Sequence, residues 1–289
     1  MESLNTGMTN KGPTADVAVI ISTYNRPKAL NLVLEGFSRQ RLRPRQILVG
    51  DDGSGEATRE VLAAWQGRGL PVEHCWHDDR GYRKSVIMNQ TLRRVTAPVC
   101  IFTDGDCVPL PGFVADHVKF FEAGHVLAGP RILAGPRLTE ALERRTDSCF
   151  DRGWVWWLQQ RVAGQINRLL PLIRLPDGAW RKKKPHKWEL VRGCNFSVAT
   201  DHVRRAGGFE ENLYGWGPDD SDLAVRMINA GVRVKSLRCA APVLHLWHQE
   251  ESRVTLEQNR AYLASALAEK RTRAVAGFSD EEIAGLLGR

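Results

Sequence analysis

Short apolar runs that end in polar loops, each followed by an amphipathic segment, constrain the fold of this chain most strongly. Residues 17–22 form a β-branched run that ends in Thr23-Tyr24-Asn25-Arg26-Pro27, and residues 28–40 then carry apolar side chains at helical spacing. A second run, 46–50, leads into Asp51-Asp52-Gly53-Ser54-Gly55 and another helical pattern. This alternation predicts a Rossmann-like α/β fold with a mostly parallel sheet flanked by helices.

A third apolar run, Val99–Thr103, is followed at its carboxyl end by Asp104-Gly105-Asp106. Ligands of open α/β sheets bind beyond the carboxyl ends of the strands, where neighbouring loops converge. We therefore expect Thr23, Asp52 and Asp106 to share one cleft. Each loop alone is ordinary turn chemistry, but three of them at successive strand ends favour a binding site.

The Asp104-Gly105-Asp106 triplet has two carboxylates separated by one small residue, which suits a divalent cation held against a diphosphate. Oxygen ligands of this kind favour Mn²⁺ or Mg²⁺. Such a cation would neutralise charge on a departing nucleoside diphosphate. His245 and His248 follow in a segment predicted to close the sheet, and either neutral imidazole is able to complete the ligand set.

A second acidic cluster lies in Gly215-Trp216-Gly217-Pro218-Asp219-Asp220-Ser221-Asp222, directly before a helical run over residues 223–230. Carboxylates this close resist joint ionisation, and an N-cap role explains only one of them. One is therefore expected to act as a general base toward an attacking sugar hydroxyl. Trp216 offers a flat apolar face for a sugar ring.

Five segments together resemble family 2 glycosyltransferases with a galactosyltransferase-type C-terminal region. In chain order they are Ile20–Arg26, Val49–Ser54, Gly81–Ser85, Asp104–Asp106 and Gly215–Asp222. Their order and separations match over about residues 17–248. The resemblance implies a GT-A fold, an inverting single displacement and a nucleotide sugar, commonly UDP-linked, bound with manganese or magnesium.

The resemblance also implies roles for individual residues, to which the sugar-stacking Trp216 is added. Asp220 matches the catalytic base, and Asp219 stands where the family more often has Glu and would bind the acceptor. The expected metal ligands are Asp106, Asp104 and His248. The expected nucleotide-sugar contacts are Ser22, Thr23, Tyr24, Asn25, Asp52, Arg83, Asp104, Asn195 and Trp216.

The chain is expected to have a flexible N-terminus (1–15), a GT-A domain (16–250) and a C-terminal helical tail (251–289). Within the domain, the nucleotide-binding half covers about 16–110 and the acceptor and catalytic half about 111–250.

A basic amphipathic insert is predicted at about residues 150–187, with one amphipathic helix over 154–174 and a run of basic residues, Arg181-Lys182-Lys183-Lys184, behind it. Two interpretations stand. The helix packs on the domain and the basic run is solvated, or the insert contacts anionic lipid through Trp and Arg side chains.

Charge and cysteine content narrow the class of protein. The formal net charge of +8 favours anionic partners, but the basic residues are dispersed and no nucleic-acid-binding module is recognisable. Six cysteines lack the close pairing of a zinc site or a disulfide framework, so they are expected to be reduced and mostly buried. Without a signal-peptide core or a spanning segment, the chain is expected in the cytoplasm, at the inner face of the plasma membrane if the lipid interpretation holds.

The predicted reaction transfers a sugar from a nucleoside diphosphate to a hydroxyl of a glycan or glycolipid acceptor, as in cell-surface polysaccharide or lipopolysaccharide biosynthesis. A nucleotidyltransferase would need a glycine-rich phosphate loop after the first strand, and Ser22–Asn25 contains none. The alternative from another class is a non-catalytic module that binds a nucleotide sugar or a glycan. Such a module would be expected to lack either the metal carboxylates or the base, whereas both are present.

Overall fold

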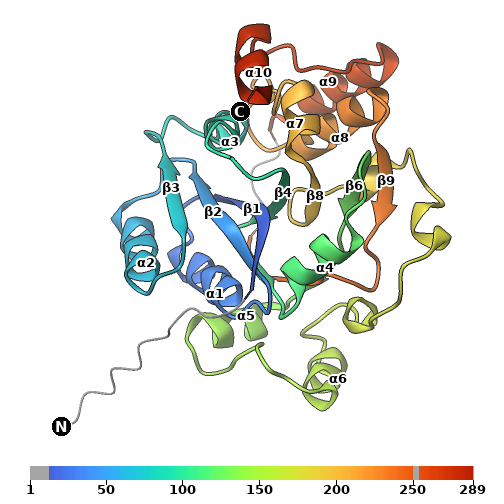
Figure 1. The fold of residues 1–289 in the computed structure, drawn as a ribbon. Helices are drawn as coiled ribbons and strands as arrows, with labels where there is room; N and C mark the ends of the chain where they lie inside the picture. The colour runs from blue at the N-terminus through green and yellow to red at the C-terminus, as the bar shows by residue number, and fades with distance from the viewer. Residues whose placement is uncertain (1–12, 250–253, 289) are drawn as a thin grey trace.

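The computed structural model describes residues 13–249 and 254–288, which form a mixed α/β fold around a large sheet (Figure 1). In spatial order the strands of this sheet are β3 (Val72–Trp76), β2 (Arg43–Asp51), β1 (Thr14–Thr23), β4 (Val99–Asp104), β8 (Phe196–Ala199), β6 (His125–Ala128) and β9 (Arg233–Ser236). Only β8 runs antiparallel to its neighbours, so the predicted mostly parallel sheet is confirmed.

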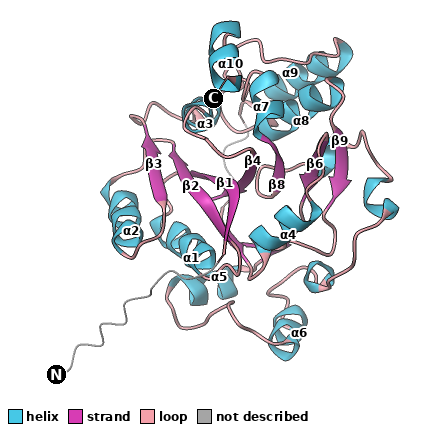
Figure 2. Ribbon diagram, viewed as in Figure 1, coloured by secondary structure: helices cyan, strands magenta, loops and turns pink. Residues whose placement is uncertain are grey.

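Helices cover both faces of this sheet (Figure 2). They pack there because the strand side chains alternate between two buried apolar clusters. One face carries α1 (Pro27–Ser38), α2 (Glu56–Gly67), α4 (Phe113–Phe120) and α5 (Pro136–Glu143). The other carries α3 (Lys84–Leu92), α7 (Thr200–Arg205), α8 (Asp219–Asn229) and α10 (Asp280–Leu287). Helix α9 (Leu256–Ala268) precedes α10 in the described part of the C-terminal segment.

A small second sheet lies beside the end of β4. Its central strand β10 (Val243–His245) pairs antiparallel with β5 (Cys107–Pro109) and parallel with β7 (Arg131–Leu133). The segment that contains the two expected metal-binding histidines is therefore fixed next to the acidic loop after β4. All six cysteines are free and buried, as expected.

One boundary prediction changes at the N-terminus. Strand β1 begins at Thr14, inside the range predicted to be a flexible N-terminus. Residues 1–12, 250–253 and 289 lie outside the described residues. Within the described part of the chain, no helix combines the length and apolar character needed to cross a bilayer.

The amphipathic helix predicted over residues 154–174 is too long. Helix α6 covers only Trp154–Val162, because Gly164 follows in the left-handed region with φ +69°. The chain then turns back, and Ile166 is buried in an isolated bridge with Ala134. Beyond it come three short 3₁₀ turns, at Leu170–Leu172, Ala179–Lys182 and Trp188–Leu190.

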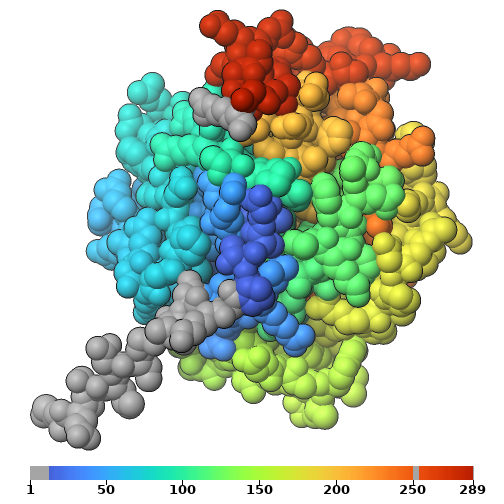
Figure 3. Space-filling view, in the orientation of Figure 1, coloured from blue at the N-terminus to red at the C-terminus, as the bar shows by residue number. Residues whose placement is uncertain are grey.

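Arg181 does not belong to a solvated basic run. Its guanidinium is buried and donates to the carbonyls of Ser236 (3.0 Å), Arg238 (2.8 Å) and Leu175 (2.8 Å). It also lies over the ring of Phe120, with the guanidinium carbon 4.3 Å from the ring centre. Arg181 therefore anchors the insert to the domain. In the space-filling view the N-terminal part of the insert (yellow-green) lies at the opposite end of the molecule from the C-terminal helices (red) (Figure 3).

Phe102, on the central strand β4, offers a direct test of the core. It is buried, its ring stacks on Phe196 at 4.4 Å and meets Phe209 edge-on at 5.8 Å. We expect Phe102→Ala to lower the free energy of unfolding by about 3–5 kcal/mol in urea denaturation. The control Val155→Ala, at a side chain that is 72% exposed on α6, should change it by less than about 0.5 kcal/mol. Equal losses in the two variants would contradict this packing.

Candidate active site

A cavity of about 1040 Å³ opens at the carboxyl ends of the central strands. Loops after β1, β2 and β4 form one side, the start of α8 forms another, and β10 with the residues after it closes a third. A volume of this order matches the larger small-molecule sites of proteins. The expected cleft is therefore present, and Thr23, Asp52 and Asp106 all line it.

The side chains at the ends of β1 and β2 are held by short hydrogen bonds. Ser22 Oγ donates to Asp104 Oδ1 at 2.7 Å, which joins two neighbouring strand ends. The carboxylate of Asp52 lies 2.7 Å from His77 Nε2 and accepts from the Arg83 amide at 2.8 Å. Burial raises the pKa of Asp52 against the effect of these hydrogen bonds. Tyr24 also lines the cavity and donates to Asp79 at 2.9 Å.

Three residues predicted as nucleotide-sugar contacts are not among those that line the cavity. The side-chain oxygen of Asn25 accepts from the Gly55 amide at 3.1 Å and thus braces the loop after β2. The guanidinium of Arg83 donates to the Asp78 carbonyl at 2.8 Å. Asn195 is fully buried.

Asn195 is occupied by structural contacts. Its amide nitrogen donates to the carbonyls of Pro130 (2.9 Å) and Ala241 (2.7 Å), and its oxygen lies 3.0 Å from His117 Nε2. Burial lowers the pKa of His117 to about 3, so this imidazole is neutral. In this structure the Asn195 side chain ties β8 to the segments around β7 and β10 and does not line the cavity.

Asp106 lies at the centre of a cationic and imidazole-rich group. Arg26 NH1 donates to its Oδ2 at 2.8 Å, His248 Nε2 lies 3.4 Å from the same oxygen, and His245 Nε2 lies 3.5 Å from Oδ1. Burial alone would raise the pKa of Asp106, but His245, Arg26 and His248 outweigh it and hold that pKa below its usual range. Both candidate histidines therefore face the same carboxylate.

Lys84 stands between two acidic groups that the sequence places far apart. Its Nζ lies 3.3 Å from Asp219 Oδ2 and 3.6 Å from Asp104 Oδ1. Burial opposes its charge, but the surrounding carboxylates raise the pKa of Lys84 well above its usual value. This buried ammonium connects the loop after β4 to the start of α8. The resemblance pointed to Arg83 in the Gly81–Ser85 motif, whereas the neighbouring lysine reaches the cavity.

Asp220 lies at the first turn of α8 and lines the cavity. The Gly193 amide donates to its Oδ2. Burial and the adjacent Asp219 raise the pKa of Asp220 to about 6, although Lys84 and the Gly193 amide act in the opposite direction. A carboxylate of this kind is ionised at neutral pH and accepts protons more readily than an ordinary Asp.

The donor set around Asp106 fits a divalent metal of the manganese type. Asp106 would supply a carboxylate oxygen and His245 and His248 imidazole nitrogens, with Asp104 at the end of the preceding strand as a further carboxylate; Mn²⁺ accepts ligands of both kinds. Mg²⁺ suits the oxygens but has less preference for nitrogen. The group faces the cavity, where a diphosphate would meet it.

Positive charge also gathers beside this group. Arg131 and Arg192 line the cavity, and Arg168 donates twice to the Arg131 carbonyl, at 3.0 and 2.7 Å. Burial and then the nearby Arg192, Arg131 and Arg238 lower the pKa of Arg168. Among the described residues none of these four arginines lies within ion-pair distance of a carboxylate. The cavity is therefore suited to an anionic ligand.

The C-terminal tail contributes to the wall, which the sequence did not indicate. Leu256, Arg260 and Leu263 of α9 line the cavity, and Asn259 on the same helix donates to the Trp216 carbonyl at 3.2 Å. Trp216 itself lines the cavity and is 37% exposed, as a sugar-stacking platform needs to be.

Solved structures share this architecture. The mannosyltransferase PcManGT from Pyrobaculum calidifontis, in complex with GDP-Man and Mn²⁺, superposes with a TM-score of 0.54 at 16% identity, over 94% of this chain and 74% of the other. S. aureus TarS (residues 1–349) in complex with UDP gives 0.57 at 15% identity, over 94% and 71%. The sheet, its order and these neighbours define a GT-A fold.

The sequence itself matches two family descriptions. Glycosyl transferase family 2 covers residues 18–187, and the N-terminal domain of galactosyltransferase covers residues 179–249. The chain therefore belongs to glycosyl transferase family 2.

Curated relatives agree with this assignment. Validoxylamine A glucosyltransferase of Streptomyces hygroscopicus subsp. limoneus is 27% identical over 232 residues, covering 75% of this chain and 48% of the relative. Chondroitin synthase of Escherichia coli is 24% identical over 263 residues, covering 85% and 36%. The chain thus spans about half or less of the length of these two relatives.

The charge balance around Lys84 predicts a measurable shift. Because its ammonium stabilises the ionised form of Asp220, Lys84→Met should raise the pKa of Asp220 above its value of about 6. Carbon-13 NMR titration of labelled aspartate carboxyls measures it, and Asp220→Asn assigns the signal. The exposed Lys187→Met serves as the control and should leave this pKa unchanged. An identical Asp220 pKa in the Lys84 and Lys187 variants would contradict the coupling.

Proposed function

We propose that this chain is an inverting glycosyltransferase that moves a sugar from a nucleoside diphosphate, UDP in the first instance, to a hydroxyl of a glycan acceptor. One observation carries the proposal: the metal-type group around Asp106 and the raised-pKa carboxylate of Asp220 line the same cavity. An inverting displacement needs both functions, charge neutralisation at the leaving group and proton removal at the nucleophile, on one substrate pair.

The donor would bind with its nucleotide against the loops after β1 and β2. Ser22, Thr23, Tyr24 and Asp52 offer polar groups there, and the arginines near His245 favour the diphosphate charge. Asn25 and Arg83 would act indirectly, by holding the loops that carry these groups. UDP is favoured because S. aureus TarS has been solved in complexes with UDP and with UDP-GlcNAc.

Asp106, Asp104 and one or both of His248 and His245 would hold Mn²⁺ or Mg²⁺. A cation bound by these residues supplies Lewis-acid stabilisation of the leaving diphosphate. The complex of PcManGT with GDP-Man and Mn²⁺ supports this assignment. Arg26, which now contacts Asp106, would share the carboxylate or turn toward the diphosphate.

Asp220 would accept the proton of the attacking acceptor hydroxyl. Its Oδ2 is oriented by the Gly193 amide, and its Oδ1 accepts from the Ser221 amide at 2.7 Å, so the carboxylate is held in one orientation. Asp219, fixed by Lys84, would hydrogen-bond the acceptor from the same loop. Trp216 would stack against a sugar ring and exclude water from the reacting centre.

The acceptor would be a glycan or glycolipid of cell-surface polysaccharide or lipopolysaccharide biosynthesis. The names of the relatives support a glycan product: chondroitin synthase of Escherichia coli and hyaluronan synthase of Pasteurella multocida. The cavity offers both aromatic and charged wall residues for such a ligand.

A binding module is the competing function, and hydrolysis of the donor distinguishes the two. A transferase without acceptor leaks sugar slowly to water, so a panel of nucleotide sugars should yield free nucleoside diphosphate in the presence of Mn²⁺ and less after chelation. A module would release none with any donor.

The Asp220→Asn variant tests the base. We expect turnover to fall by a factor on the order of 10² to 10⁴, while the dissociation constant for the nucleoside diphosphate stays the same. Calorimetry measures binding, and release of nucleoside diphosphate measures turnover. Asp16→Asn, at an exposed surface ion pair with Arg45, is the control and should behave like the wild type.

The pH profile adds a second criterion for the same variant. Because Asp220 must be ionised to accept a proton, turnover of the wild type should fall as the pH drops through about 6. This inflection should be absent from the residual activity of Asp220→Asn. Unchanged turnover, or an unchanged inflection, would remove Asp220 from the role of base.

The insert would place the enzyme at an anionic membrane surface, in the cytoplasm at the inner face of the plasma membrane. Helix α6 exposes Trp154, Val155, Leu158 and Val162, of which Val162 is 81% exposed, and Lys183 and Lys184 follow on the exposed surface. Apolar side chains next to cations are typical of segments that insert at lipid headgroups.

We expect the wild type to bind phosphatidylglycerol-containing vesicles in low salt and to bind phosphatidylcholine vesicles weakly. Replacing Val155, Leu158 and Val162 together by Ser should reduce the bound fraction several-fold in a flotation assay, without changing the melting temperature. Val275→Ser, at another side chain that is 68% exposed, should have no effect. Equal binding by all three proteins would exclude the membrane contact.

A further inference from the structure

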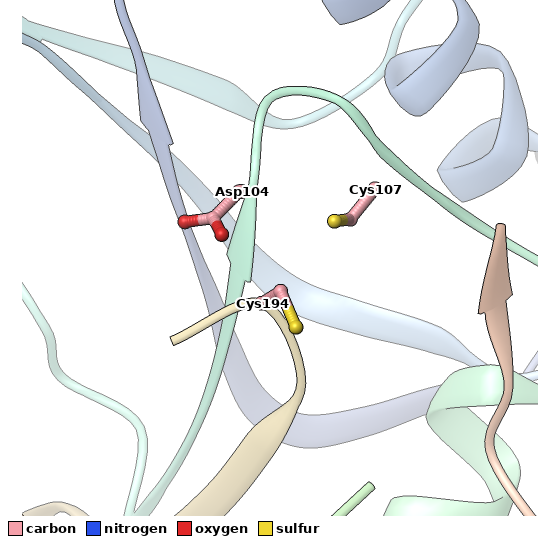
Figure 4. A group of neighbouring side chains, drawn as sticks. All are labelled: Asp104, Cys107 and Cys194. Carbon is pink, nitrogen blue, oxygen red and sulfur yellow. The ribbon is translucent and has the colours of Figure 1, made fainter. Parts of the chain in front are cut away.

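Two thiols lie directly beneath the carboxylates of the site. The Sγ atoms of Cys107 and Cys194 and a carboxylate oxygen of Asp104 lie within 4.8 Å of one another (Figure 4). Cys107 Sγ also forms a group of the same size with Asp106 and His245. Cys107 therefore belongs to both groups.

These side chains are held by rigid elements. Asp104 ends β4 and Cys107 begins β5 after a tight turn, while Cys194 precedes β8. In the small sheet His245 is the register partner of Cys107. Cross-strand partners keep their side chains close together, so the sulfur and the imidazole are brought together by backbone pairing. Backbone pairing thus fixes these donors relative to one another.

The donor set differs in kind from that of a manganese site. Thiolates favour Zn²⁺ and other soft cations, whereas Mn²⁺ and Mg²⁺ favour oxygen. Around a tetrahedral zinc with Zn–S bonds of 2.3 Å, two sulfurs lie roughly 3.8 Å apart. Atoms within 4.8 Å of one another reach this spacing by small side-chain rotations.

The cluster is accessible from solvent and lies beside a positive charge. Cys194, Asp104, Asp106 and His245 line the cavity, which gives an ion a path from solvent. The guanidinium of Arg131 lies 3.9 Å from Cys194 Sγ, and a positive charge at that position favours the thiolate. The sequence spacing does not reveal the pair of Cys107 and Cys194, because 86 residues lie between them.

We propose that Cys107, Cys194 and the carboxylate of Asp104 form a binding site for a thiophilic divalent cation of the Zn²⁺ class. Binding of this cation uses the Asp104 carboxylate, which the transfer reaction assigns to Mn²⁺ or Mg²⁺, so the two ions exclude each other and zinc inhibits. The exclusion rests on the function proposed above; the zinc site itself does not.

Cadmium reports on the site directly, because thiolate-to-cadmium charge transfer absorbs in the ultraviolet. Titration of the metal-free, reduced full-length chain with Cd²⁺ should give a band that saturates at one equivalent and is abolished by Zn²⁺. Losing even an outer-sphere partner of a metal ligand costs roughly 10- to 100-fold in affinity. Cys107→Ser and Cys194→Ser should therefore each weaken Cd²⁺ binding by at least that factor.

The matched control is Cys100→Ser. Cys100 is another fully buried thiol on β4, and its Sγ donates to the Val198 carbonyl at 3.5 Å, away from the cluster. This variant should keep the band. Cys194→Ala, which leaves no hydroxyl to bury, repeats the test with thermal unfolding as the check on folding. A band that survives in both cluster variants, or that falls equally in Cys100→Ser, would overturn the site.

Competition with Mn²⁺ tests the mutual exclusion of the two ions separately from the existence of the zinc site. A large excess of Mn²⁺ should weaken apparent Cd²⁺ binding, since the two ions share the Asp104 carboxylate. If excess Mn²⁺ left the apparent affinity for Cd²⁺ unchanged, the two ions would not exclude each other and this part of the proposal would be overturned. Because no nucleotide sugar is present in either titration, a failure of the proposed transferase reaction leaves the result of this experiment unaffected.

Discussion

Two partly buried cations allow several carboxylates to share the cavity. Lys84 lies between Asp104 and Asp219, and Arg26 contacts Asp106. Without them, acidic groups at the end of β4 and at the start of α8 would repel one another in a region of reduced dielectric constant. With them, the end of β4 and the start of α8 are connected by charge. The positions of the metal-type group and of the base follow from this balance.

Burial then gives each acidic residue a different task. Asp106 is surrounded by Arg26 and two imidazoles, so its pKa falls and it stays an anionic ligand. Asp220 has Asp219 as its neighbour and only partial compensation from Lys84, so its pKa rises to about 6. Asp106 is therefore suited to bind a cation, and Asp220 is suited to accept a proton. This separation of pKa values between carboxylates in one cavity is typical of acid–base catalysis.

The sequence predicted the sheet well because its central strands are β-branched runs buried on both sides, each followed by polar turn residues. It also predicted Thr23, Asp52 and Asp106 in one cleft, since the carboxyl ends of neighbouring strands converge. The predicted helix over residues 154–174 was too long because a glycine interrupts the apolar periodicity on which the prediction was based. Gly164 falls inside a helical spacing of apolar residues and ends α6 there.

The other features that the sequence did not predict depend on the direction of a side chain or on contacts between segments that are far apart in the chain. Arg83 and Lys84 are adjacent, and only the start of α3 decides that the lysine reaches the cavity while the arginine turns to the Asp78 carbonyl. The role of α9 in the cavity wall and the meeting of Cys107 with Cys194 depend on tertiary packing between distant segments. No motif of the sequence carries that information.

The account requires that one cavity hold the cation, the diphosphate and the base together. Crystals grown with UDP and Mn²⁺, measured at a wavelength where manganese scatters anomalously, test this most directly. We predict a single strong anomalous peak bonded to Asp106, with the diphosphate beside it in the cavity that Asp220 lines. A nucleotide bound elsewhere on the molecule, or manganese on a face that Asp220 does not share, would contradict the account.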